Sequence, residues 1–288
     1  MKKWINYYSL ACLILFLIAC NKEQKQAAEN QKELLSESET IIIPEMTTVA
    51  ARLSARVEAD DYNTFYGPVV QMGKGHLRSW INISRKDDKP LAIGIEFTEK
   101  SMDDLPGDPA NHHANMFNLT LHQKAKAITA FDHITINWEP AGHEPNGIYN
   151  IPHFDMHFYK ISMETQMAIT GVPGPVPAAG YLPSAYVIRG ATVPQMGTHW
   201  LNPASPELPP TFQPFTHTFI FGSNNGHVHF YEPMITRGFI LSGNSVSKAF
   251  PTPTNFSPVN KYYPSVYKIW KSSDNGRHYV ALTDFTWK

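Results

Sequence analysis

Three histidines and one aspartate lie close together in a short segment near the middle of the chain. Residues 142–159 read GHEPNGIYNIPHFDMHFY and contain His143, His153, Asp155 and His157. Imidazole nitrogens and carboxylate oxygens are common ligands of zinc and related metals, and both groups also transfer protons. This segment is therefore the first candidate for a functional site.

The alternation of residue types predicts a β-strand from residue 153 to residue 159. Side chains alternate between the two faces of a strand, so every second residue shares a face. One face would carry His153, Asp155, His157 and Tyr159. The other would carry Phe154, Met156 and Phe158, as expected of a face that packs in a core.

Strand geometry limits which of these side chains could share a metal ion. Same-face neighbours such as His153 and Asp155 lie ~6.6 Å apart along a strand, and His153 and His157 lie ~13 Å apart. The neighbours can share one ion at a bond length of ~2.1 Å. His153 and His157 can share one only if the chain bends, and Pro152 favours a bend at the strand start.

Further ligands would have to come from other segments. His143 precedes a predicted turn and could fold back over the strand, while His199 and Glu232 lie farther along the chain. The predicted metal ligands are His143, His153, His157, His199 and Glu232. Asp155 and Tyr159 would orient the imidazoles through hydrogen bonds. Such ligands suit a divalent transition metal, zinc first, and also manganese, iron or copper.

The same residues also fit a non-catalytic role. A buried ladder of histidine, aspartate and tyrosine can hold two sheets together through hydrogen bonds without any metal. Other chemistries lack their motifs: no Gly-x-Ser-x-Gly elbow, phosphate loop or dinucleotide fingerprint occurs. The residue pattern therefore leaves open whether the protein is an enzyme.

The N-terminus has the pattern of a bacterial lipoprotein signal. Two lysines precede an apolar stretch at residues 10–18, which is too short to span a bilayer, and Ala19 and Cys20 follow. We expect residues 1–19 to be the signal peptide and Cys20 to carry the lipid. Residues 20–45 would form a flexible tether, since residues 21–39 are almost entirely polar or small. The expected location is the bacterial cell envelope, at the outer membrane.

The remaining residues have the composition of a loop-rich β protein. Charged residues make up 17 % of the chain and aromatic residues 12 %, with 23 prolines and 17 glycines. The net charge of −1 and the lack of a basic cluster argue against nucleic-acid binding. We expect a β-rich domain at residues 46–245 and a C-terminal β extension at residues 246–288.

Helical periodicity is scarce, and the pattern predicts many short strands with few helices. The expected architecture is an antiparallel β-sandwich or barrel, either as one unit or as two β subdomains divided near Pro109. One helix is expected at residues 51–58 and a helical turn at 101–105. Proline-rich residues 170–183 predict an extended flap, and Asn224-Asn225-Gly226 predicts a hairpin turn. The predicted strands are 66–70, 77–84, 92–98, 117–122, 133–138, 153–165, 186–193, 216–221, 227–231, 239–242, 263–270 and 277–287.

Several motifs in sequence order resemble those of a family of exported bacterial proteins with a domain of unknown function. They are FYGP at residues 65–68 with GKG at 73–75, PLAIGIEF at 90–97, GH at 142–143 with GIY at 147–149, PHFDMHFY at 152–159, MGTHW at 196–200 and EPMIT at 232–236. The resemblance covers about residues 60–245. It implies an exported, β-rich, homo-oligomeric domain and implies no particular reaction or small-molecule ligand.

These observations predict a lipid-anchored envelope protein, held to the membrane through Cys20, whose β domain contains a histidine-rich metal site. The alternative is a structural or self-assembling module in which the same side chains form a buried hydrogen-bond network. The two hypotheses differ in whether the donor atoms converge on an ion or on one another.

Overall fold

The computed structural model describes residues 61–111 and 114–288. The predicted signal peptide, tether, lipidation at Cys20 and helix at 51–58 lie outside these residues. Strands make up 42 % and helices 9 % of the structure, which confirms the prediction of a mainly β protein with few helices. In the described part of the chain, the antiparallel sheets do not close into a barrel, and no helix is long and apolar enough to cross a membrane.

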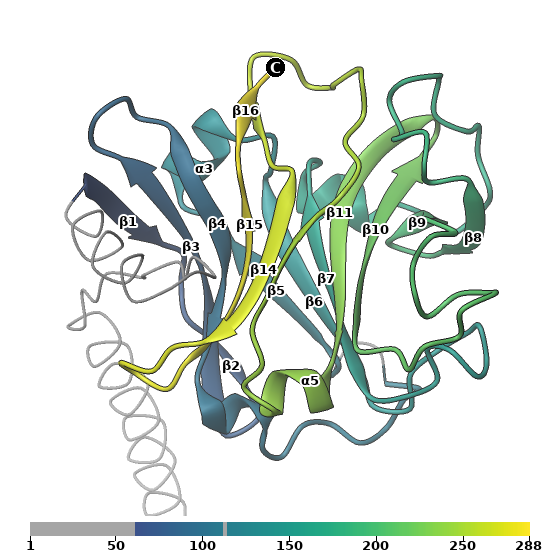
Figure 1. Cartoon of the computed structure of the whole chain (residues 1–288), viewed down its shortest axis with the longest axis horizontal. Helices are drawn as coiled ribbons and strands as arrows, with labels where there is room; N and C mark the ends of the chain where they lie inside the picture. The colour runs from purple at the N-terminus through teal and green to yellow at the C-terminus, as the bar shows by residue number, and fades with distance from the viewer. Residues whose placement is uncertain (1–60, 112–113) are drawn as a thin grey trace, which may run out of the picture. The chain divides into compact units, whose positions relative to one another are not determined.

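Two seven-stranded sheets form the framework (Figure 1). The strands of the first sheet are β1 (Tyr62–Tyr66), β2 (Val70–Met72), β3 (Gly75–Ser84), β4 (Pro90–Phe97), β12 (Val246–Ala249), β14 (Val266–Lys271) and β15 (His278–Thr283). Its order is β1-β3-β4-β15-β14-β12, and β2 pairs with β3. The C-terminal residues 246–288 thus complete this sheet, because β15 pairs directly with β4.

The second sheet carries the histidine-rich segment in its middle (Figure 1). Its order is β5-β6-β7-β11-β10-β9-β8, with every neighbouring pair antiparallel. The strands are β5 (Met116–Thr120), β6 (His133–Glu139), β7 (His153–Tyr159), β8 (Ile188–Val193), β9 (Gly197–Leu201), β10 (His217–Asn224) and β11 (His227–Thr236). A separate pair joins β13 (Tyr262–Tyr263) and β16 (Thr286–Trp287).

A single apolar cluster joins the two sheets. Ile81 and Ile93 from the first sheet and Ile134, Phe154 and Phe158 from the second belong to it, and all are almost fully buried. Each fully buried large apolar side chain contributes about 1.5–3 kcal/mol to folding. The face of β7 predicted to pack in a core does so, and its histidine-bearing face lies on the other side of the second sheet.

Each of the short α-helices begins where a polar side chain caps the chain. The described residues contain η2 (Glu99–Met102), a 3-10 helix, and the α-helices α3 (Gln123–Ile128), α4 (Met163–Met167) and α5 (Arg237–Leu241). The strand predicted at 239–242 is wrong, because Thr236 Oγ1 accepts a hydrogen bond from Phe239 N and starts α5 instead. The strand predicted at 153–165 ends at Tyr159 because the hydroxyl of Ser162 caps α4.

The loops follow their turn residues. The predicted hairpin at Asn225-Gly226 is confirmed: β10 ends at Asn224, β11 begins at His227, and both turn residues have positive φ. The helical turn predicted at residues 101–105 overlaps the structure only at residues 101 and 102, where η2 ends. The strands β9 and β12, which the sequence pattern did not predict, extend the second and first sheets respectively.

Candidate metal centre

The candidate ligands lie on the face of the second sheet that points away from the apolar cluster. Strand β7 pairs with β6 without a register shift from His133↔Tyr159 to Glu139↔His153. The bend that could bring His153 and His157 to one ion is therefore absent from these paired residues. The structure instead divides the histidine-rich face into two groups.

The first group consists of His143, His153 and Asp155. Asp155 Oδ2 lies 3.3 Å from His143 Nε2, and Asp155 Oδ1 lies 3.1 Å from His153 Nε2. His153 and Asp155 are buried on β7, whereas the side chain of His143 is 40 % exposed. His143 reaches the strand from the loop before it, as its position in the sequence predicts.

The second group consists of His157, His199 and Glu232. Glu232 Oε1 lies 3.5 Å from His157 Nε2, and Glu232 Oε2 lies 3.8 Å from His199 Nε2. The three residues come from β7, β9 and β11. In the register of β7 with β11, Tyr231 pairs with Phe158 and Met234 with Asp155, which places Glu232 beside His157.

The structure thus brings together all five predicted ligands, but as two sets instead of one. His143 and His153 lie in the first group, and His157, His199 and Glu232 form the second. Asp155 offers a carboxylate oxygen to the first group directly. Tyr159 lies one position farther along the same face, where its ring stacks on His157 at 5.6 Å and its hydroxyl donates to Gln195 O.

Backbone carbonyls fix the ring orientation of three of these histidines. The Nδ1 atoms of His143, His153 and His199 lie 2.7, 2.7 and 3.2 Å from the carbonyl oxygens of Glu144, Ile151 and Ala191. A carbonyl oxygen can only accept, so each Nδ1 carries the proton. The Nε2 atom of each ring is then left to face a carboxylate, which is the usual arrangement of metal-binding histidines.

Buried donor and acceptor atoms in the two groups lack hydrogen-bond partners. In the described residues these include His153 Nε2, Asp155 Oδ1, both ring nitrogens of His157 and Glu232 Oε2. The approach of His153 Nε2 to Asp155 Oδ1 is close, but its geometry is not that of a hydrogen bond. Unpartnered buried polar atoms are rare and each costs about 1–3 kcal/mol.

The separations fit atoms that share an ion. Two ligands bonded at ~2.1 Å to a tetrahedral zinc ion lie about 3.4 Å apart. The four nitrogen–oxygen distances in the two groups run from 3.1 to 3.8 Å. The ligand atoms within each group all lie within 4.8 Å of one another. Each group therefore has the donors and the spacing to hold one metal ion.

The first group carries separated charges in the absence of metal. Burial raises the pKa of Asp155, but the charge of His153 and the hydrogen bond and charge of His143 outweigh burial and hold the pKa well below its usual value. Burial lowers the pKa of His143, but its hydrogen bond to Asp155 and the charge of that carboxylate raise it to about 9. An imidazolium and a carboxylate thus face each other.

Burial favours the neutral forms of the three side chains in the second group. Burial lowers the pKa of His157 to about 3 and also lowers the pKa of His199. Burial raises the pKa of Glu232 well above its usual value, and the charge of Asp155 raises it further. Although His157 and Glu232 lie close enough for an ion pair, burial disfavours the charged form of each side chain. A cation would compensate an ionised Glu232.

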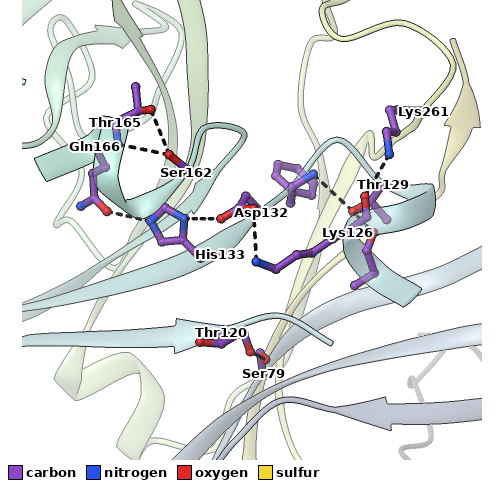
Figure 2. A network of polar contacts seen from close by, with 12 residues as sticks. Ser79, Thr120, Lys126, Thr129, Asp132, His133, Ser162, Thr165, Gln166 and Lys261 are labelled. Carbon is purple, nitrogen blue, oxygen red and sulfur yellow. Dashed lines mark hydrogen bonds and ion pairs between the residues drawn. The ribbon is translucent and has the colours of Figure 1, made fainter. Parts of the chain in front are cut away.

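A neighbouring histidine on the same face shows what a metal-free network looks like (Figure 2). His133 on β6 stacks on Tyr159, and its two ring nitrogens lie 3.2 Å from Asp132 Oδ1 and 2.7 Å from Gln166 Oε1. Both nitrogens therefore have partners. His157, on the adjacent strand, has no partner for either ring nitrogen. This difference identifies His133 as a structural histidine and His157 as a candidate ligand.

Loops cover the first group. Phe215 packs edge-on against His153 at 5.5 Å and against Tyr149, whose hydroxyl donates to buried Glu207 at 3.0 Å. Residues 202–216 thus contribute to the cover, a role that the sequence pattern did not predict. Residues 170–183 lie beside the hairpin instead, where Pro175 O accepts from Gly226 N.

Gly222 is a further residue of the site that the ligand pattern could not reveal. It pairs with His199 on β9 and with Phe230 on β11. A Cβ atom at this position would lie 1.9 Å from the Phe230 ring, which packs against His157 at 4.7 Å and His199 at 5.2 Å. Glycine here leaves room for the Phe230 ring, which packs against both histidines of the second group.

Comparison with known proteins gives one partial match. Residues 86–138 match the model of the TTHB210-like family, described as hypothetical protein TTHB210. The segment runs from the turn before β4 into β6 and ends before all of the candidate ligands. No curated protein and no solved structure matches the chain. Over this segment, the chain is similar to a family of unknown function, which agrees with the expectation of a domain of unknown function.

Proposed function

We propose that this protein binds divalent transition-metal ions at the two histidine–carboxylate groups on the outer face of its second sheet. The observation that carries the proposal is the convergence of ring nitrogens and carboxylate oxygens 3.1–3.8 Å apart. Four of these atoms are buried without a hydrogen-bond partner: His153 Nε2, Asp155 Oδ1, His157 Nε2 and Glu232 Oε2. A hydrogen-bond network would pair these atoms, as it does around His133. An ion bonded to each set would supply the missing partners.

Zinc is the metal that the ligands favour. Each group offers two imidazole nitrogens and one carboxylate, a set that zinc accepts in tetrahedral geometry and that other first-row metals also accept. Three protein ligands leave a fourth position open for water, as in catalytic zinc sites. When bound, zinc would lower the pKa of that water and make hydrolysis accessible. Binding without turnover uses the same ligands.

Metal content tests the proposal directly. The full-length chain, purified without a polyhistidine tag, is expected to carry near-stoichiometric zinc or a related metal when measured by plasma mass spectrometry. The double variant His153→Ala/His157→Ala removes one ligand from each group and is expected to lose that metal. The variant His227→Ala is the matched control, since His227 is exposed on β11 and belongs to neither group.

The double variant could lose metal because it lacks two ligands or because it does not fold, and two further experiments distinguish these causes. Circular dichroism shows whether the double variant folds, and Glu232→Gln removes a charged ligand from the second group at nearly constant volume. A folded double variant with full metal content would overturn the assignment. A wild-type protein that is folded, metal-free and unable to take up zinc on titration would favour a structural network.

We also propose that the domain is anchored to the cell envelope through a lipid on Cys20. Support comes from the N-terminal sequence alone, in which a charged start and a short apolar stretch precede Ala19-Cys20. Growth with radiolabelled palmitate is expected to label the wild-type protein and to leave Cys20→Ser unlabelled. Equal labelling of both proteins would contradict the lipid assignment.

A further inference from the structure

A pocket lies away from the metal groups, where the C-terminal residues meet the end of β7 and the β10–β11 hairpin. Its volume is about 170 Å³. Tyr231 and Tyr263, both almost fully buried, form part of its lining, together with Phe256 and the amine-bearing Lys160. Tyr231 belongs to the apolar cluster between the sheets, so it lies on the opposite face of β11 from Glu232.

Hydrogen bonds between distant segments hold the wall of this pocket. In the proline-rich segment, Pro175 O accepts from Gly226 N at 3.0 Å, and Gly180 O accepts from the backbone nitrogens of Thr254 and Asn255 at 3.0 and 2.9 Å. Ala179 O also accepts from Asn255 Nδ2 at 3.2 Å. The segment that was expected to form a flap is thus fixed against the hairpin, and Tyr181 from it lines the pocket.

Lys160 gives the pocket an amine that has no acidic side chain as a partner. Its Nζ donates to Ser257 O at 2.8 Å and lies 5.8 and 5.6 Å from the ring centres of Tyr231 and Tyr263. None of the ion pairs found among the described residues includes Lys160. Burial lowers the pKa of its amine to about 7, which is the expected response of a cation that lacks a counter-ion. A bound anion would reverse this effect.

The size and lining of the pocket define the ligand further. A cavity of ~150 Å³ accommodates benzene, so this pocket has room for one six-membered ring. Tyr231, Phe256 and Tyr263 offer ring faces and edges, against which an aromatic body packs favourably. We propose that the pocket binds a small aromatic carboxylate, with the carboxylate on Lys160 Nζ and the ring against these three side chains.

Benzoate is the probe that tests the proposal. Isothermal titration of the full-length chain is expected to show benzoate binding with a dissociation constant below about 1 mM. Benzamide, which has the same ring without the charge, and acetate, which has the charge without the ring, are expected to bind at least about tenfold more weakly. Benzoate binding no tighter than that of either analogue would overturn the proposal.

Two variants locate the bound benzoate. Lys160→Gln is expected to weaken binding about tenfold or more, because it removes the charge from the carboxylate contact. Tyr181→Ala removes a ring that is 38 % exposed and is also expected to weaken binding, with the buried residues left unchanged. Lys86→Gln is the control, since Lys86 is exposed in the β3–β4 turn. Unchanged affinity in both Lys160→Gln and Tyr181→Ala would place benzoate elsewhere and refute the pocket assignment.

Discussion

Removal of bound metal is expected to lower the midpoint of thermal unfolding by about 5–15 °C for each ion that is lost. A ligand held at 100–1,000 times its dissociation constant stabilises the folded state by about 2.7–4.1 kcal/mol per site. Each kcal/mol shifts the midpoint by about 2–4 °C in a domain of 150–250 residues. The shift is large because chelation leaves two buried ligand atoms, His157 Nε2 and Glu232 Oε2, without partners.

Calorimetry of the zinc-loaded protein, with and without a strong chelator, measures this shift. The variant His153→Ala/His157→Ala is the control, and its midpoint should not respond to the chelator because each group lacks a ligand. Readdition of zinc should restore the wild-type midpoint. If chelation removes the metal and leaves the wild-type midpoint within about 1 °C, the ions contribute little to folding and the groups are stabilised by other contacts.

The histidine-rich strand could be predicted because its signal is local. Alternation alone places His153, Asp155 and His157 on one face and Phe154 on the other, and the structure has this arrangement. The division of the ligands into two groups is not local. It depends on the register that sets Glu232 beside His157, and this register is fixed by pairing between strands about 75 residues apart.

Long-range pairing also explains the role of the C-terminal residues. A sequence pattern can show that residues 277–287 favour strands, but it cannot show that β15 pairs with β4, about 190 residues earlier. Local competition between helix capping and strand preference explains why the strand predicted at 239–242 is wrong. Phe239 and Ile240 suit a strand by residue type, yet the hydroxyl of Thr236 caps a helix at that point because a satisfied backbone donor outweighs a weak strand preference.

The zinc affinity of the first group is expected to rise about hundredfold between pH 6.5 and pH 8.5. The pKa of His143 in the metal-free protein is about 9, because its hydrogen bond to Asp155 and the charge of that carboxylate outweigh burial. Below pH 9, zinc must therefore displace a proton from this imidazole. Release of one proton raises the apparent affinity about tenfold for each pH unit.

The variant His157→Ala isolates this effect, since it removes a ligand from the second group and leaves the first complete. Competition with a chelator of known affinity at each pH gives the apparent constant. In His143→Gln/His157→Ala the proton-bearing ligand is absent, so zinc should bind more weakly and with a smaller pH slope. A His157→Ala protein whose zinc affinity does not change with pH would show that His143 is not a ligand.

The proton on the His143 imidazole weakens zinc binding, but it stabilises the folded state of the metal-free protein. A histidine whose pKa is higher in the folded state stabilises that state fully below its unfolded pKa, near 6.5, and this contribution disappears as the pH rises through 9. The metal-free protein therefore loses the stabilising charge pair of His143 and Asp155 over the pH range in which the group gains zinc affinity. Metal and proton thus compete for the His143 imidazole beside Asp155, and the stabilisation by zinc should be greatest at the alkaline end of this range.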